Sequence, residues 1–220
     1  MTDTASRIPP PPGEEEIPVH NRTYAVNTYR IDSQTMRIRG RVTDTKPAGL
    51  YVDGDTEPMD VHDMVVDLVV GYPDLTIQSV NVVFDTHPHS SCPTIEVAYQ
   101  QLAGTSIARG FTRKLTELFG GPSGCTHVGA LLKAMAPVAV QSMYSMRLAE
   151  PGAPKGFVTE NGDEEGRRRA QSFVRNSCHV WAEDGEMMTA SDNGESYEAP
   201  IWIRDRLEKL GRLDEMSNWE

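Results

Sequence analysis

A glycine-rich stretch from Gly120 to Gly124 leads directly into Cys125 and His127. The residues that follow repeat apolar side chains at helical spacing, so a helix is predicted to begin at this point. The first turn of a helix has free N–H groups and the positive end of the helix dipole, which favour a thiolate or a bound anion. The spacing therefore predicts that Cys125 is either reactive or metal-binding, with His127 able to converge on the same point.

Two further groups of potential ligands flank a predicted pair of strands: Asp60, His62 and Asp63 before it, and His87, His89 and Cys92 after it. Cys92 precedes a proline that suits the first position of a helix, so it shares the helix-start setting of Cys125. Thiolate and imidazole ligands suit zinc or iron, and a catalytic ion keeps one position open for water or substrate. None of these groups has the CxxC or HExxH spacing of established metal motifs, so the ligand set stays open at this point.

The elements that must position these residues begin with two segments of period-two alternation, near 24–28 and 36–42. Such alternation is typical of β-strands with one buried face, and turn residues around Asp32 join the two segments. The polar face of the second segment consists of Arg37, Arg39 and Arg41. We expect these arginines to pair with the chain's own acids; a carboxylate-binding or phosphate-binding surface is the alternative.

Two more strands are predicted over 64–70 and 75–84, separated by the turn residues Tyr72-Pro73-Asp74. Helices are predicted over about 92–102, 106–119 and 125–146, and Pro137 should kink the last of them. The predicted fold class is therefore α+β, with a mostly antiparallel sheet of about four strands and helices packed on one face.

The chain of 220 residues is predicted to have three parts. Residues 1–19 are rich in proline and glutamate and are expected to be a disordered arm. Residues 20–150 form the core domain that carries the site. Residues 151–220 form a linker and a partly helical C-terminal extension, which could fold back over the sheet or make the chain a homo-oligomer.

Composition limits the partners and the compartment. A formal net charge of -11 argues against nucleic acid and against an anionic membrane surface, because either partner requires a basic footprint. No signal peptide and no apolar run of membrane-spanning length is present, which predicts a cytoplasmic protein. Three cysteines are too few for a disulfide scaffold, so they are expected to be core, catalytic or metal-binding residues.

The order of short motifs resembles a bacterial family whose common domain is of unknown function. The resemblance runs from about His20 to Gln141, and Gly-Cys-Thr-His at 124–127 is its most specific part. It implies no activity. The motifs that carry it are His20-x-Arg22, Gly40-x-x-x-Asp44-Thr45-Lys46, His62-Asp63-Met64, Cys92-Pro93, Leu102-x-Gly104 and Gly120-Gly121 with Gly124-Cys125-Thr126-His127.

The order of elements from Met64 to Met146 is also similar, more distantly, to iron–sulfur scaffolds of the NifU-like type. By position, Cys92 and Cys125 match the second and third cysteines of those proteins, and their first cysteine is absent here. The resemblance implies a NifU-like core with a mixed site for a single divalent metal, zinc or iron, in place of a cluster. The implied ligands are His62, Cys92, Cys125 and His127.

Three functions follow as hypotheses. The first is a small metalloenzyme of the lyase or hydrolase class that acts on a small organic substrate, aromatic or hydroxylated, with Asp63 or His89 as general base. The second is a non-catalytic scaffold or adaptor with a NifU-like fold, which would act through protein contacts of its tryptophan-containing tail. The third is a metal-free thiol enzyme in which Cys125 is the nucleophile and His127 or His62 the base.

Overall fold

The computed structural model describes residues 17–108, 110–153, 155–156, 171–172, 174–195 and 198–219. The chain divides into two compact units, Met1–Glu150 and Pro151–Glu220. Most of the predicted disordered arm lies outside the described residues, as does much of the predicted linker. None of the helices in the described ranges has both the length and the apolar character needed to cross a membrane.

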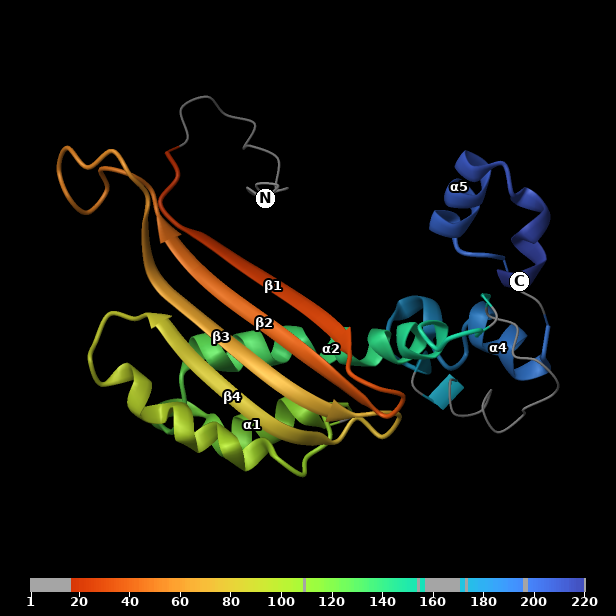
Figure 1. Ribbon diagram of the computed structural model, residues 1–220, viewed down its shortest axis with the longest axis horizontal. Coiled ribbons are helices and arrows are strands. Elements are labelled where there is room, and N and C mark those ends of the chain that lie inside the picture. Colours follow the sequence, from red (N-terminus) through yellow and green to blue (C-terminus); the bar gives the residue numbers. More distant parts are fainter. Residues whose placement is uncertain are drawn as a thin grey trace. The chain divides into compact units, whose positions relative to one another are not determined.

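The first unit is built on a four-stranded antiparallel sheet in which neighbours in sequence are neighbours in space, as Figure 1 shows. The strands are β1 (Asn21–Arg30), β2 (Thr35–Lys46), β3 (Met59–Gly71) and β4 (Ile77–Thr86). Alternation decides which face is buried: Met36, Ile38 and Val42 of β2 have no exposed surface, whereas the arginines between them are exposed. The predicted strands and their pairing are confirmed.

Helices cover the buried face of this sheet. The elements are η1 (Cys92–Leu102), α1 (Phe111–Phe119), η2 (Gly121–Ser123) and α2 (Thr126–Leu148). α2 runs along β1, β2 and β3, and η1 packs beside β4 (Figure 1). The long apolar stripe of α2 supplies Leu131, Leu132 and Met135 to the core, all fully buried. The α+β fold class predicted from the sequence is therefore confirmed.

Two predicted helices differ in detail from the observed elements. The segment 92–102 is a 3-10 helix, and its buried residues Tyr99 and Leu102 stand three apart, which matches the 3-10 repeat. The next helix begins at Phe111 and not near 106, because the residues before it pair with the β3–β4 connection. Ile107 donates its N–H to the carbonyl of Leu75, and Gly110 takes a left-handed conformation directly before the helix.

The arginine face of β2 pairs with the chain's own acids, which is the alternative that the sequence favoured. Arg37 and Arg39 both approach Asp67, with closest N–O distances of 3.8 and 3.5 Å. Arg41 donates two hydrogen bonds to the carboxylate of Asp63: Nε donates to Oδ1 at 2.7 Å, and Nη2 donates to Oδ2. The outer face of the sheet is therefore a charged surface with its own counter-ions, on the side opposite α2.

The second unit contains η3 (His179–Trp181), α4 (Glu186–Asn193), α5 (Ile201–Leu210) and η4 (Leu213–Trp219). α5 begins directly after Pro200 and buries Ile203 and Leu207, in agreement with a partly helical extension. Trp202 and Trp219 form an edge-to-face pair with ring centroids 6.1 Å apart. A role of this unit in self-association stays a prediction.

The close approach of β2 to α2 gives a first test. A Cβ at Gly40 would lie 2.7 Å from Sδ of Met135 and 3.0 Å from Cδ1 of Leu131. Gly40→Val should therefore destabilise the unit by about 1–3 kcal/mol through overpacking. Urea unfolding measures the change. Gly129→Ala is the control, since nothing lies within 4 Å of its added Cβ; a Gly40→Val protein as stable as this control would contradict the packing described.

Candidate metal centre

An acidic residue lies on the buried face of the sheet. Asp44 is in phase with Val42 on β2, so it points toward the helices, and only 1% of its surface is exposed. Strand register places Arg22 of β1 opposite Asp44 on one side and His62 of β3 opposite it on the other. Three adjacent strands thus contribute three polar residues in one row on one face.

Arg22 holds the Asp44 carboxylate with two parallel hydrogen bonds. Its Nε donates to Oδ1 at 2.6 Å, and its Nη2 donates to Oδ2 at 2.7 Å. This charge-assisted pair holds the pKa of Asp44 at about 2, below its ordinary value, and raises the pKa of Arg22. Asp44 is therefore a carboxylate at any physiological pH.

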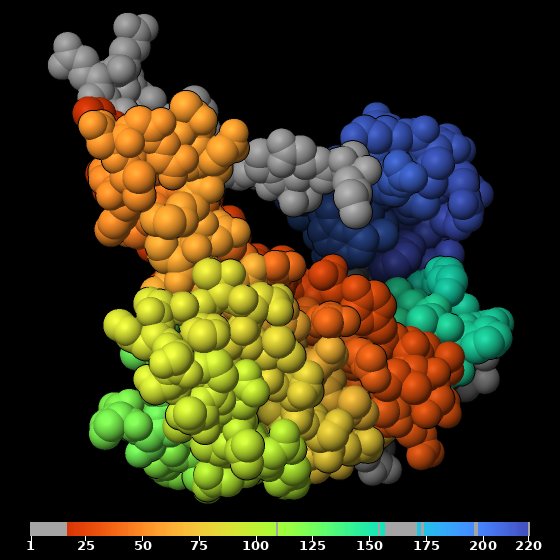
Figure 2. All heavy atoms as spheres, turned by 60° about the vertical axis from the view of Figure 1, so that its left-hand side comes forward, coloured from red at the N-terminus to blue at the C-terminus, as the bar shows by residue number. Residues whose placement is uncertain are grey.

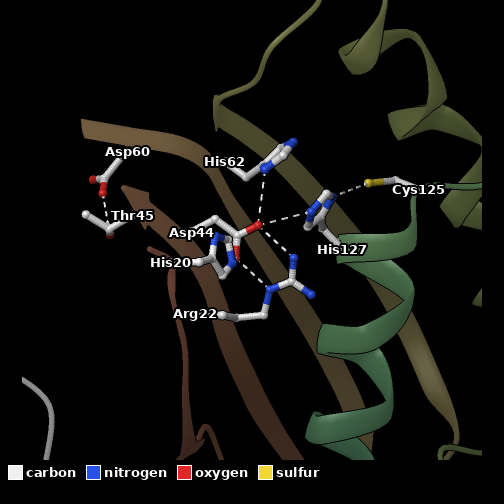
Figure 3. A network of polar contacts seen from close by, with 8 residues as sticks. All are labelled: His20, Arg22, Asp44, Thr45, Asp60, His62, Cys125 and His127. Carbon is white, nitrogen blue, oxygen red and sulfur yellow. Dashed lines mark hydrogen bonds and ion pairs between the residues drawn. The ribbon is translucent and has the colours of Figure 1, made fainter. Parts of the chain in front are cut away.

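Three imidazoles surround the same carboxylate, as Figure 3 shows. Nδ1 of His62 and Nε2 of His127 each lie 3.1 Å from Oδ2 of Asp44, and Nε2 of His20 lies 3.4 Å from Oδ1. The rings of His62 and His127 are stacked, with centroids 3.8 Å apart. Burial, followed by the neighbouring His62 and Arg22, lowers the pKa of His127, so this ring is neutral at pH 7 and has a lone pair to offer.

Two irregularities in strand pairing frame His62. Between Asp44 and Thr45 the register to β3 shifts, so Thr45 pairs with Asp60, and its hydroxyl donates to the Asp60 carboxylate at 2.6 Å. A second shift follows Asp63 in the pairing of β3 with β4. Bulges of this kind re-aim side chains. His62 itself is in phase with Met64 and directly opposite Asp44, so alternation along β3 places it on the same face as Asp44 at the end of regular pairing.

α2 supplies the remaining groups from its first turn. Cys125 is the N-cap residue, and His127 follows within the first turn, pointing back toward the sheet (Figure 3). Sγ of Cys125 lies 3.7 Å from Nδ1 of His127, the ring nitrogen that does not face Asp44. The sequence Cys-x-His at a helix start therefore places the thiol and the carboxylate on opposite edges of one imidazole.

Asp44, His62 and His127 could hold a metal ion. One ligand atom from each lies within 4.8 Å of the others, and in the described part of the chain they are the one His/Cys/Asp/Glu group that meets this condition. Neutral imidazole and carboxylate are common ligands of zinc and of non-haem iron.

The structure brings together some of the residues predicted from the sequence and separates others. His62 and His127 meet at Asp44, and Cys125 contacts His127. Cys92 begins η1 and is not a member of the Asp44 group within the described ranges. The carboxylate of Asp63 is engaged by Arg41 on the opposite face from His62, and His89 is exposed in the connection after β4.

Sequence reasoning did not assign Asp44, Arg22 or His20 to the site. The signal was present in the alternation of β2, where Asp44 continues the apolar series of Met36, Ile38 and Val42. A charged side chain at a strand position that faces the core requires an oppositely charged or hydrogen-bonding partner. That this partner is Arg22 depends on the register of β1 against β2, and the whole hairpin sets that register.

The chain belongs to the family described as "Protein of unknown function (DUF2889)", whose profile matches residues 20–141. The matched region contains every residue of the candidate centre, from His20 to His127. Neither the curated proteins nor the solved structures provide a match to this chain. The family predicted from the sequence motifs is confirmed, whereas the NifU-like resemblance is not.

The Arg22–Asp44 pair predicts a specific acid sensitivity of the metal-free protein. Because the folded-state pKa of Asp44 is lowered from 3.8 to about 2, its contribution to stability is complete above the unfolded value and is lost as pH falls toward 2. Asp44→Asn should therefore cost about 2 kcal/mol at pH 7 and almost nothing at pH 2. Denaturant unfolding in the presence of a chelator, at several pH values, measures the difference.

The control for this experiment is Asp85→Asn, which removes an exposed acid 4.0 Å from Arg41. An exposed ion pair contributes little, so this variant should follow the wild-type pH curve. A constant difference between Asp44→Asn and wild type across the pH range would contradict the assigned pKa of Asp44.

Proposed function

We propose that the protein is a metal-dependent enzyme of the lyase or hydrolase class, with zinc or iron bound by Asp44, His62 and His127. The observation that carries the proposal is the convergence of two imidazole nitrogens on one oxygen of a buried carboxylate, each at 3.1 Å. The substrate is proposed to be a small organic molecule with a carbonyl or hydroxyl group.

Crowding at Oδ2 of Asp44 supports a cation at this point. Three nitrogens, from Arg22, His62 and His127, lie within 3.1 Å of that oxygen. A carboxylate oxygen has two lone pairs, so it does not satisfy three N–H donors equally well. If the imidazoles present lone pairs instead, a bound cation removes the repulsion between these lone pairs and the carboxylate charge.

The separations also fit ligands of a shared ion. Zinc–nitrogen and zinc–oxygen bonds are about 2.1 Å long, so two ligands of one ion are separated by about 3.0 Å at right angles and about 3.4 Å in a tetrahedron. The observed separation of 3.1 Å for each nitrogen–oxygen pair lies within this range.

Three protein ligands leave coordination positions for water or substrate, as in catalytic sites. The chemistry that such an ion supplies is polarisation of a carbonyl or hydroxyl and a lowered pKa of bound water. Arg22 fixes the orientation of Asp44, and His20, with 38% of its side chain exposed, lies on the solvent side of the same carboxylate. His20 is thereby the described imidazole of the cluster best placed to exchange protons with solvent.

A metal-free thiol enzyme is the second candidate, and one contact favours it. Cys125, His127 and Asp44 form a series in which Sγ faces Nδ1 at 3.7 Å and Nε2 faces Oδ2 at 3.1 Å. A nucleophile, a base and an orienting acid are arranged in this order in cysteine and serine hydrolases. The first candidate is preferred because this series gives no role to His62, which is stacked on His127 and shares its oxygen.

Metal analysis of the purified protein tests the first candidate. Protein prepared anaerobically should contain close to one equivalent of zinc or iron per chain by elemental analysis. Asp44→Asn, His62→Ala and His127→Ala should each lose it, since each removes one of three ligands. His89→Ala and Cys92→Ser should retain it, because neither residue belongs to the Asp44 group.

Other outcomes of this measurement have clear meanings. Wild-type protein without metal, before and after incubation with zinc or ferrous iron, would contradict the proposal. Loss of metal in Cys92→Ser would instead support the ligand set implied by the NifU-like resemblance. A centre that holds four protein ligands and binds no water would favour a structural metal in a scaffold protein.

Alkylation of the free cysteines separates the two candidates. Cys178 is exposed and Cys125 is half-buried. If Cys125 is not a nucleophile, exposure should control the rates, and Cys178 should react faster with iodoacetamide at pH 7 in metal-free protein. Mass spectrometry of the peptides gives both rates in one sample. A faster reaction of Cys125 than of Cys178 would move the assignment to the thiol enzyme.

A further inference from the structure

The two ring nitrogens of His127 have different partners, and this difference assigns a role to Cys125. Nε2 faces Asp44 at 3.1 Å, whereas Nδ1 faces Sγ of Cys125 at 3.7 Å. A neutral imidazole that binds a metal through one nitrogen carries its proton on the other. With Nε2 as the ligand atom, Nδ1–H donates to the sulfur of Cys125.

We propose that Cys125 is a positioning residue of the metal centre, which accepts a hydrogen bond from His127 and thereby fixes its tautomer and ring orientation. The inference rests on the proposed function. It differs from the expectation that Cys125 itself binds the metal. Ligating histidines generally give their second N–H to such an outer partner, and losing the partner weakens metal binding.

The direction of the sulfur supports this role over direct ligation. Sγ approaches the Nδ1 edge of the imidazole, and Asp44 approaches the Nε2 edge (Figure 3). An ion bound between Asp44 and Nε2 therefore has the imidazole ring between itself and the sulfur. Cys125 therefore contacts His127 and does not contact the ion itself.

The surrounding structure holds Cys125 in place. The hydroxyl of Tyr99 accepts the Cys125 N–H at 2.8 Å and lies 3.4 Å from the Cys125 carbonyl oxygen. Tyr99 is fully buried, and its ring packs on Phe119 with centroids 4.5 Å apart. Its hydroxyl is therefore a fixed anchor inside the core, directed at the backbone of one residue.

Gly124 secures the same loop from the other side. A Cβ on Gly124 would lie 2.5 Å from the carbonyl oxygen of Phe119 and 2.6 Å from its Cβ. The loop thus passes against the end of α1 more closely than any side chain permits. Together, Tyr99 and Phe119 connect the core to the position of Cys125, and through it to His127.

Metal affinity tests the proposal. Cys125→Ala should weaken binding of zinc, measured by competition with a chromophoric chelator, by about 10–100-fold, the effect expected when an outer partner is lost. Cys125→Ser keeps an acceptor and should recover part of that loss. Cys178→Ser, which changes an exposed cysteine in the second unit, is the matched control and should bind like wild type.

A spectroscopic measurement separates a positioning role from ligation. Wild-type protein loaded with Co²⁺ should show d–d absorption and no sulfur-to-cobalt charge-transfer band, since Cys125 is not a ligand. Such a band in wild type, lost in Cys125→Ala, would overturn the proposal while leaving a metal site. Equal zinc affinity of Cys125→Ala and wild type would overturn it as well.

A double-mutant cycle tests the anchor. Tyr99→Phe preserves the buried ring and removes the hydroxyl, so it should weaken zinc binding in the same direction as Cys125→Ala. Because Tyr99 acts through Cys125, the two losses should not add in the double variant. Full additivity would show that Tyr99 does not act through Cys125.

Failure of wild type to bind zinc, iron or cobalt would contradict the proposed function itself. That outcome is distinct from the changes in affinity expected for the Cys125 and Tyr99 variants.

Discussion

The pairing of Arg22 with Asp44 is the interaction on which the candidate centre depends. A carboxylate on the helix-facing side of a sheet is costly unless it is paired, and Arg22 pairs with both of its oxygens from the neighbouring strand. That pair keeps Asp44 ionised, and the ionised carboxylate in turn gathers the imidazoles of β3 and α2. The sheet and the helix are thereby joined by polar contacts at the start of α2. Further along the helix they are joined by apolar packing and by the hydrogen bond from Ser142 to Thr28 of β1.

Two arginine–aspartate pairs of the sheet, each joined through two arginine nitrogens, show how position decides role. Arg41 and Asp63 are joined by the same two-nitrogen geometry as Arg22 and Asp44, but on the outer face. That pair belongs to a face on which arginines lie beside aspartates. The Arg22–Asp44 pair faces α2, where Nδ1 of His62 and Nε2 of His127 lie beside one carboxylate oxygen. The same chemistry therefore forms a surface ion pair on one side and a candidate metal centre on the other. In Figure 2 the β2–β3 connection, which joins the strands of Asp44 and His62, stands out in orange above β4 and η1.

Much of the fold could be predicted from local patterns. The alternation in β2 and the helical stripe of α2 identify their elements directly, and the Cys-x-His start of α2 pointed to one corner of the centre. The sequence patterns indicate His62 and His127 as candidate ligands because histidine is scarce in this chain. They do not indicate Asp44, because acids are common and its place beside Arg22 and His62 depends on the register of three strands. Cys92 shares a helix-start setting with Cys125, but only the tertiary arrangement decides which of the two contacts a histidine.

The most direct measurement of the central claim is X-ray absorption at the metal edge of the loaded protein. The spectrum should show a first shell of nitrogen and oxygen at about 2.0–2.1 Å, with the outer-shell scattering of two imidazoles and without sulfur. This spectrum should be the same in Cys92→Ser, because Cys92 does not belong to the Asp44 group. A sulfur shell at about 2.3 Å would show a thiolate ligand and contradict the assignment of Asp44, His62 and His127 as the metal-binding residues.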